Sequence, residues 1–267
     1  MKTTPLLLTL GLVLSHSTIA SESCFLITER NRVIKQEGDC QTRYAPCSTF
    51  KIAISLMGYD DNLLKNETKP EYPFKKGYAD YLAVWKEPHN PTLWMKNSCI
   101  WYSQVLTEQL GMKKFKDYVE LFNYGNKDVS GDKGKNNGLT HAWLSSSLEI
   151  SPIEQTQFLQ KMLDHNLPVS VKAQEMTNNI LFLEELPNGW KLYGKTGSGS
   201  LLNADKTQKL ELQHGWFVGY LKKDQRTITF AYHIVDDEKQ ETYAGPRAKV
   251  AAKEKLVNLI SSQPTLS

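Results

Sequence analysis

The sequence has 267 residues, of which 40% are hydrophobic and 23% charged, and this composition excludes an intrinsically disordered chain. It contains 32 lysine and arginine residues against 29 aspartate and glutamate residues, a formal net charge of +3, with the two signs mixed along the chain. Neither a nucleic-acid-binding surface nor an anionic-membrane surface is therefore expected. The length suits one large domain or two closely packed lobes.

The N-terminus has the three parts of a secretory signal. Lys2 supplies a charged start, residues 6–14 form a short apolar run, and small and polar residues lead to Ala20. The apolar run is too short to span a bilayer, so we expect cleavage after Ala20 and export. The domain would then be residues 21–267, periplasmic or secreted, with a net charge of +2 once Lys2 is lost.

Four cysteines in an exported chain allow disulfide bonds. Cys24 and Cys40 bracket two strand-like segments that are joined by a turn at residues 29–32, and a hairpin would set the two cysteines opposite each other. We therefore predict a disulfide between Cys24 and Cys40. Cys47 and Cys99 are expected to be free and packed as small hydrophobic residues.

A serine and a lysine three residues apart begin the next helical segment. Residues 48–51 read Ser-Thr-Phe-Lys, and residues 50–57 are apolar on nearly every side, which is typical of a helix in the protein interior. Ser48 and Lys51 would share one face of a helical turn. Because a buried lysine is costly without a partner or a chemical task, this pair indicates a nucleophile and its base.

Helical patterns, loops and aromatic residues dominate residues 58–186. The best-marked helix follows Ser151, with proline at its first position and Glu154 at its third, a capping box. After this segment the pattern changes to strands. Strands are predicted at 190–195, 215–220 and 227–235, and an amphipathic helix at 247–260.

The first hairpin and the late strands both lack partners, so we expect them to join in one antiparallel sheet. The predicted fold is α+β: N- and C-terminal helices flank this sheet, and an all-helical lobe is inserted into it. The sheet lobe would comprise about 21–57 and 187–267, and the helical lobe about 58–186. No internal repeat is present.

A second motif, Lys195-Thr196-Gly197, predicts the other wall of the site. Lys195 would add positive charge and hold a substrate carboxylate, to which Thr196 offers a hydroxyl. Gly197 would let a peptide-like ligand lie along the strand edge. Between the two motifs, Ser103 lies in helix-like sequence and is a candidate proton relay to a leaving amine.

Taken in order, these motifs resemble those of the class D serine β-lactamases, the oxacillinases, over essentially the whole mature chain. The matching segments are residues 48–51, 103–105, 124–126, 142–144, 195–197 and 216–219. The resemblance implies the serine β-lactamase/transpeptidase-like fold. It also implies hydrolysis of the β-lactam amide of penicillin-type antibiotics through an acyl-serine intermediate, and hence β-lactam resistance.

The resemblance further implies that Lys51 carries a carbamate formed with CO2 or bicarbonate, the base for acylation and deacylation; no other cofactor is expected. Trp143 would hydrogen-bond this carbamate, and Val105 would help to keep its pocket dry. The backbone N–H groups of Ser48 and Ser198 would form the oxyanion hole.

Four further expectations concern the rim of the site. Arg247 matches an arginine that binds the substrate carboxylate in part of the family, although a surface arginine at a helix start is the alternative. Tyr124 and Asn126 would belong to a loop that lines the site, with a structural role. Cys47, directly before the nucleophile, would tune the pocket or fill space.

Three alternatives share parts of this pattern. A penicillin-binding transpeptidase or carboxypeptidase has the same serine and lysine logic but is normally longer and membrane-anchored. The sensor domain of a β-lactam receptor would react once without turnover. A class A β-lactamase would have Ser-Asp-Asn where this chain has Ser-Gln-Val at 103–105. No metal site is expected, because the histidines of the mature chain lack ligand spacing: His89, His141, His165, His214 and His233. The oligomeric state is left open.

Overall fold

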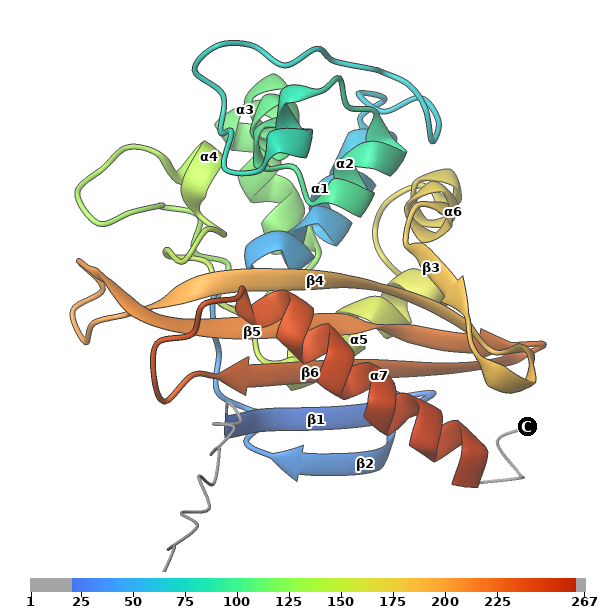
Figure 1. Ribbon diagram of the computed structural model, residues 1–267. Helices are drawn as coiled ribbons and strands as arrows, with labels where there is room; N and C mark the ends of the chain where they lie inside the picture. Colours follow the sequence, from blue (N-terminus) through green and yellow to red (C-terminus); the bar gives the residue numbers. More distant parts are fainter. Residues whose placement is uncertain (1–20, 263–267) are drawn as a thin grey trace, which may run out of the picture.

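A six-stranded antiparallel sheet in the order β2-β1-β6-β5-β4-β3 forms the centre of the computed structural model, which describes residues 21–262 (Figure 1). The strands are β1 (Ser21–Glu29), β2 (Arg32–Gly38), β3 (Phe182–Glu185), β4 (Lys191–Leu202), β5 (Lys209–Lys223) and β6 (Arg226–Val235). Because β1 pairs with β6, the first hairpin finds its partner in the last one, which confirms the predicted antiparallel sheet.

Helices cover both faces of this sheet and build a lobe beside it (Figure 1). The α-helices are α1 (Lys51–Asp60), α2 (Pro91–Asn97), α3 (Ile100–Leu121), α4 (Gly138–His141), α5 (Pro152–Leu163), α6 (Val171–Asn179) and α7 (Ala244–Ser262). Short 3-10 helices are η1 (Cys47–Phe50), η2 (Ala83–Lys86) and η3 (Pro187–Gly189). The α+β class with an inserted helical segment is confirmed.

Two hydrophobic cores lie on opposite sides of the sheet. One packs the apolar face of α7 against residues such as Phe217 and Phe230, and the other joins the sheet to α1 and the helical lobe. Helix α1 belongs to the second core, since all its residues from Lys51 through Tyr59 are buried. The sequence pattern, apolar on nearly every side, is therefore explained by a central position.

Local signals read from the sequence are also realised. Ser151 accepts a hydrogen bond from the Glu154 N–H and donates its own backbone N–H to the Glu154 carboxylate, which confirms the capping box at the start of α5. Strand β3 was not expected. It is a four-residue edge strand whose residues do not alternate between buried and exposed, and only its pairing with β4 defines it.

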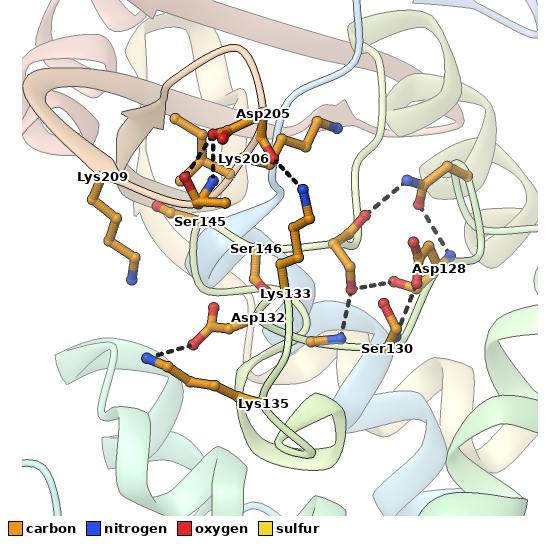
Figure 2. A pocket seen from close by; sticks show the side chains of 15 residues that line it. Asp128, Ser130, Asp132, Lys133, Lys135, Ser145, Ser146, Asp205, Lys206 and Lys209 are labelled. Carbon is orange, nitrogen blue, oxygen red and sulfur yellow. Dashed lines mark hydrogen bonds and ion pairs between the residues drawn. The ribbon is translucent and has the colours of Figure 1, made fainter.

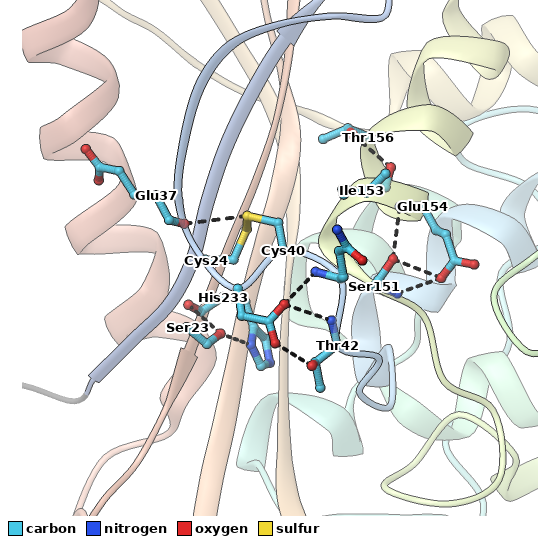
Figure 3. The surroundings of a disulfide bond; sticks show 12 residues. Ser23, Cys24, Glu37, Cys40, Thr42, Ser151, Ile153, Glu154, Thr156 and His233 are labelled. Atoms are coloured by element: carbon cyan, nitrogen blue, oxygen red, sulfur yellow. Dashed lines mark hydrogen bonds between the residues drawn. A yellow bond between two sulfur atoms is a disulfide. The ribbon is translucent and has the colours of Figure 1, made fainter.

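The predicted disulfide is present, with the Cα atoms of Cys24 and Cys40 5.0 Å apart (Figure 3). Cys47 and Cys99 are free and buried. No helix in the range 21–262 is long and apolar enough to cross a bilayer. The expected signal segment, 1–20, lies outside the described residues.

Candidate active site

The predicted nucleophile and base meet at the start of α1. The Lys51 Nζ donates a hydrogen bond to the Ser48 Oγ at 3.1 Å, and Lys51 is 0% exposed. Burial lowers the pKa of Lys51 to about 8, since the charged amine is penalised away from water. A fraction of the amine is therefore neutral near pH 7, and a neutral amine can accept a proton or react with CO2.

Hydrogen bonds from both lobes fix the turn that carries Ser48. The backbone N–H of Cys47 donates to the Trp143 carbonyl at 3.0 Å, and the hydroxyl of Thr49 donates to the Pro46 carbonyl at 2.7 Å. Thr49 in turn accepts a hydrogen bond from Gln155 of α5 at 2.9 Å. The nucleophile therefore stands on a 3-10 turn that is held by hydrogen bonds to buried residues.

Strand β4 forms the opposite wall and approaches this turn closely. A Cβ placed on Gly197 would lie 2.8 Å from the Pro46 carbonyl oxygen and 3.3 Å from the Cys47 Cβ, so only glycine allows this contact. Lys195 is buried, and its pKa is lowered by burial and by the charge of Lys51. Its Nζ donates to the Ser98 Oγ and to the Thr196 carbonyl, both at 3.0 Å.

These two walls enclose a pocket of about 200 Å³ that contains the Ser48 hydroxyl. Most of its lining is apolar, which favours exclusion of water from the reacting atoms. Its lining residues are Ser48, Tyr81, Leu82, Trp85, Ser98, Ile100, Thr196, Gly197, Ser198, Tyr243 and Pro246. We call it the nucleophile pocket.

The proton-relay serine was misplaced in the sequence-based prediction. Ser103 is buried on α3, where its hydroxyl accepts a hydrogen bond from the Trp94 indole N–H at 2.9 Å, and it does not line the nucleophile pocket. The serine that does is Ser98, the C-cap of α2, which is held in the left-handed region with φ 56°. Its hydroxyl accepts from Lys195, so Ser98 occupies the position expected of Ser103.

Val105 was misplaced for the same reason. It lies one turn further along α3 than the pocket and lines a different hollow, together with Tyr78 and Glu108. Ile100 contributes to the nucleophile pocket in its place. Ser98 and Ile100 repeat the spacing of a serine followed two residues later by a branched aliphatic residue. The sequence therefore contains the same pattern five residues before 103–105.

Trp143 is buried beside the nucleophile turn and has an unusual feature. Its indole Nε1 finds no hydrogen-bond partner among residues 21–262, although the ring packs on Phe50, the residue before Lys51, at 5.6 Å between centroids. An unpaired buried N–H costs about 1–3 kcal/mol. A carbamate on Lys51 would supply an acceptor, so the residues present fit that modification.

The Tyr-Gly-Asn motif has a structural role. The Asn126 side chain accepts a hydrogen bond from the Glu149 N–H at 3.0 Å and donates to the Ser147 carbonyl at 2.8 Å. Gly125 has φ 52°, and a Cβ there would lie 1.9 Å from the Glu149 carbonyl oxygen. Tyr124 packs on Phe50 beneath the turn, but Asn126 lines the separate cavity of Figure 2 and not the nucleophile pocket.

Arg247 does not reach into the nucleophile pocket. Its guanidinium donates two hydrogen bonds to the buried Asp236 carboxylate, at 2.8 and 2.7 Å, and a bidentate pair of this kind consumes the fork that would bind a substrate carboxylate. Ser198, in contrast, lines the pocket, and its hydroxyl accepts from the Gly245 N–H at 2.8 Å. The start of α7 is thus joined to β4.

A row of buried polar groups leads away from the nucleophile turn through the sheet. The His214 Nε2 lies 3.8 Å from the Cys47 Sγ, and the His214 Nδ1 lies 3.1 Å from the His233 Nε2. His233 in turn contacts the hydroxyl of Ser23 (Figure 3). Burial raises the pKa of the Cys47 thiol to about 11 and lowers that of His214 to about 4, so both groups are neutral near pH 7. No group of three or more metal-ligating side chains occurs within the described part of the chain.

This neutral histidine predicts a loss of stability in acid. The pKa of His214 is about 4 in the folded state against about 6.5 when unfolded, so below pH 6.5 the unfolded chain binds more protons. The contribution of neutral His214 to the free energy of unfolding is complete above pH 6.5, and it falls by about 2 kcal/mol between pH 7 and pH 5. Urea unfolding at the two pH values should show a smaller acid loss in His214→Gln than in the wild type. The matched control, His165→Gln at an exposed position, should keep the wild-type loss; equal losses in all three proteins would refute the assignment.

Comparison with known proteins agrees with this geometry. Residues 22–256 match the family described as penicillin binding protein transpeptidase domain. The β-lactamase OXA-1 of Escherichia coli is 45% identical over 216 residues, which cover 77% of this chain and 75% of the relative. The β-lactamase OXA-9 of Klebsiella pneumoniae is 38% identical, covering 87% and 88%.

The similarity to a solved structure extends over the whole fold. The crystal structure of the class D β-lactamase OXA-427 matches with a TM-score of 0.85 and 41% identity, over 91% of this chain and 99% of that one. The chain therefore belongs to the penicillin-binding protein transpeptidase family and, within it, to the class D serine β-lactamases.

Proposed function

We propose that this protein hydrolyses the β-lactam amide of penicillin-type antibiotics through an acyl-enzyme on Ser48, and that it thereby confers β-lactam resistance. The observation that carries the proposal is the 3.1 Å hydrogen bond from the Lys51 Nζ to the Ser48 Oγ inside the nucleophile pocket. A serine hydroxyl is a weak nucleophile at its own pKa, and a buried base beside it removes that limitation.

In acylation, the Ser48 Oγ attacks the β-lactam carbonyl carbon and gives its proton to the base at Lys51. The N–H groups of Ser48 and Ser198 would stabilise the oxyanion. The ring nitrogen leaves and takes a proton from the Ser98 hydroxyl, which Lys195 polarises from 3.0 Å. The proton that the base at Lys51 received from Ser48 would replace the proton lost from Ser98, so the base is free again. Thr196 and Lys195 would bind the substrate carboxylate. In deacylation the base at Lys51 takes a proton from a water whose oxygen attacks the ester carbon, and it returns that proton to the departing Ser48 oxygen.

We further propose that Lys51 works as a carbamate formed with CO2. A carbamate supplies a carboxylate-like base, which can activate both the serine and the hydrolytic water. Lys51 is suited to hold it because its lowered pKa leaves the neutral amine that reacts with CO2. The Trp143 Nε1, which has no hydrogen-bond partner among residues 21–262, would donate to it, and Ile100 lines the pocket.

Steady-state loss of penicillin absorbance, with and without bicarbonate, tests the function. Many turnovers that are enhanced by bicarbonate are expected. Consumption of one equivalent followed by a halt would instead identify a β-lactam sensor or a transpeptidase. Export to the periplasm after removal of residues 1–20 is a separate proposal, which N-terminal sequencing of the protein from a periplasmic extract tests.

Trp143→Phe keeps an aromatic ring in the core and removes only the indole N–H. We expect kcat to fall about tenfold to a hundredfold at ambient CO2, the range found when a hydrogen-bond partner of a reactive group is removed, and to recover partly with added bicarbonate. Trp190→Phe is a matched control, because its buried Nε1 is also unpaired but lies in the core under α7. An unchanged bicarbonate response in Trp143→Phe would contradict the carbamate contact.

A further inference from the structure

A second hollow of about 460 Å³ adjoins the nucleophile pocket. The two share Tyr81, Ile100, Ser198 and Tyr243 in their linings, so a ligand acylated on Ser48 extends from one into the other. Its further walls come from α3, from the segment after α4 and from β4 and β5. We call it the side-chain hollow. None of the catalytic steps above uses the groups that lie only in this hollow.

Lys209, the first residue of β5, brings a positive charge to the lining of the side-chain hollow. Its Nζ donates to the Leu144 carbonyl at 3.1 Å, and it forms no ion pair with a carboxylate among residues 21–262. Two other lysines nearby, in contrast, do lie close to carboxylates. Lys206 pairs with Glu149 at 2.6 Å, and Lys135 lies 4.0 Å from Asp132. Figure 2 shows Lys209, Lys135 and Asp132 on the same side of the separate cavity that Asn126 also lines.

Nothing in the hollow neutralises this ammonium group. Glu211, the carboxylate in its lining, is paired with Lys239 at 2.9 Å. Asp132, outside the hollow, accepts a hydrogen bond from Asn137 at 2.9 Å in addition to its contact with Lys135. His141 lines the hollow, and burial lowers its pKa, so its ring is neutral near pH 7. Asp132 interacts electrostatically with Lys209 but forms no ion pair with it within residues 21–262, so the formal charge left without an ion pair in the hollow is positive.

We propose that the side-chain hollow receives the acylamino side chain of the substrate, and that Lys209 makes the enzyme favour β-lactams whose side chain carries a carboxylate. The inference rests on the proposed β-lactam hydrolysis. Because Lys209 is an exposed residue, the preference is of the size of a surface ion pair and is screened by salt. It acts on recognition, and the chemistry at Ser48 is untouched.

The test compares two penicillins that differ in one group, benzylpenicillin and its α-carboxy derivative. For Lys209→Met, kcat/KM for the carboxylated substrate should fall about fivefold, which corresponds to about 1 kcal/mol. For benzylpenicillin it should stay within about twofold, as the size of a surface ion pair requires. Lys209→Glu should lower the ratio of the two values further. The difference between wild type and Lys209→Met should shrink at high ionic strength.

Lys206→Met is the matched control, because Lys206 is a neighbouring lysine that is paired with Glu149 and does not line the side-chain hollow. It should leave the ratio unchanged. Equal losses on both substrates in Lys209→Met, or no loss on either, would overturn the inference. Failure of the wild type to turn over benzylpenicillin would instead refute the proposed function, so the two failures are distinguishable.

Discussion

Lys51→Met should lower steady-state turnover of benzylpenicillin on the order of a thousandfold, because it removes the only base that contacts the Ser48 hydroxyl among the described residues. Methionine matches the length of lysine and avoids the cost of burying an amine, so the fold should be retained or stabilised. Deacylation should suffer most, since the base that would activate the hydrolytic water is lost. Mass spectrometry of the intact protein should therefore detect a long-lived acyl adduct.

Ser48→Ala is the control for this experiment. It should show neither turnover nor adduct, because the atom that forms the ester is gone. An adduct on Ser48→Ala would place the nucleophile elsewhere, and rapid turnover by Lys51→Met would show that Lys51 is not the base. Unfolding midpoints of both variants, measured in urea, separate a chemical defect from a loss of structure.

Ser98→Ala should lower kcat for benzylpenicillin by about a hundredfold or more, the size expected for loss of a positioned proton donor. Ser98 lines the nucleophile pocket, and its hydroxyl accepts a hydrogen bond from the Lys195 Nζ at 3.0 Å. Since Ser98 is a helix cap with φ 56°, Ser98→Gly is a second variant that relieves backbone strain and should show the same kinetic loss.

Ser103→Ala is the matched comparison. It should keep kcat within about threefold and lower the free energy of unfolding by about 1–3 kcal/mol, because the buried Trp94 indole loses its acceptor. The reverse outcome, a kinetic loss in Ser103→Ala and none in Ser98→Ala, would restore the assignment that the sequence first suggested. Measuring kcat and urea unfolding for both serines therefore decides which one is the relay.

The error at Ser103 shows what a motif search cannot see. Both serines precede an aliphatic residue by two positions, and 103–105 is the more literal match to Ser-x-Val. What separates them is the point at which α3 begins. Ile100 starts that helix, so Ser98 stays in the connecting turn beside β4, whereas Ser103 is carried round into the core of the helical lobe. Helix boundaries are the least certain part of any sequence-based prediction.

The partner of Arg247 could not be predicted from the sequence for a different reason. Its partner Asp236 lies 11 residues earlier in the sequence, at the end of β6, and no periodicity relates the two. Only the packing of α7 on the sheet brings the guanidinium to a carboxylate that is 0% exposed. The same packing leaves Tyr243 and Pro246 to line the nucleophile pocket.

Features that arise within a few residues, or from burial alone, could be predicted from the order of residues. These are the helix-turn spacing of Ser48 and Lys51, the capping box of α5, the hairpin that sets Cys24 against Cys40, and the α+β pattern. The packing of distant segments, in contrast, sets which serine meets Lys195, which carboxylate binds Arg247 and which lysine near the pocket has no ion pair within residues 21–262. Those contacts join segments far apart in the chain, and their geometry follows from how helices and sheet pack.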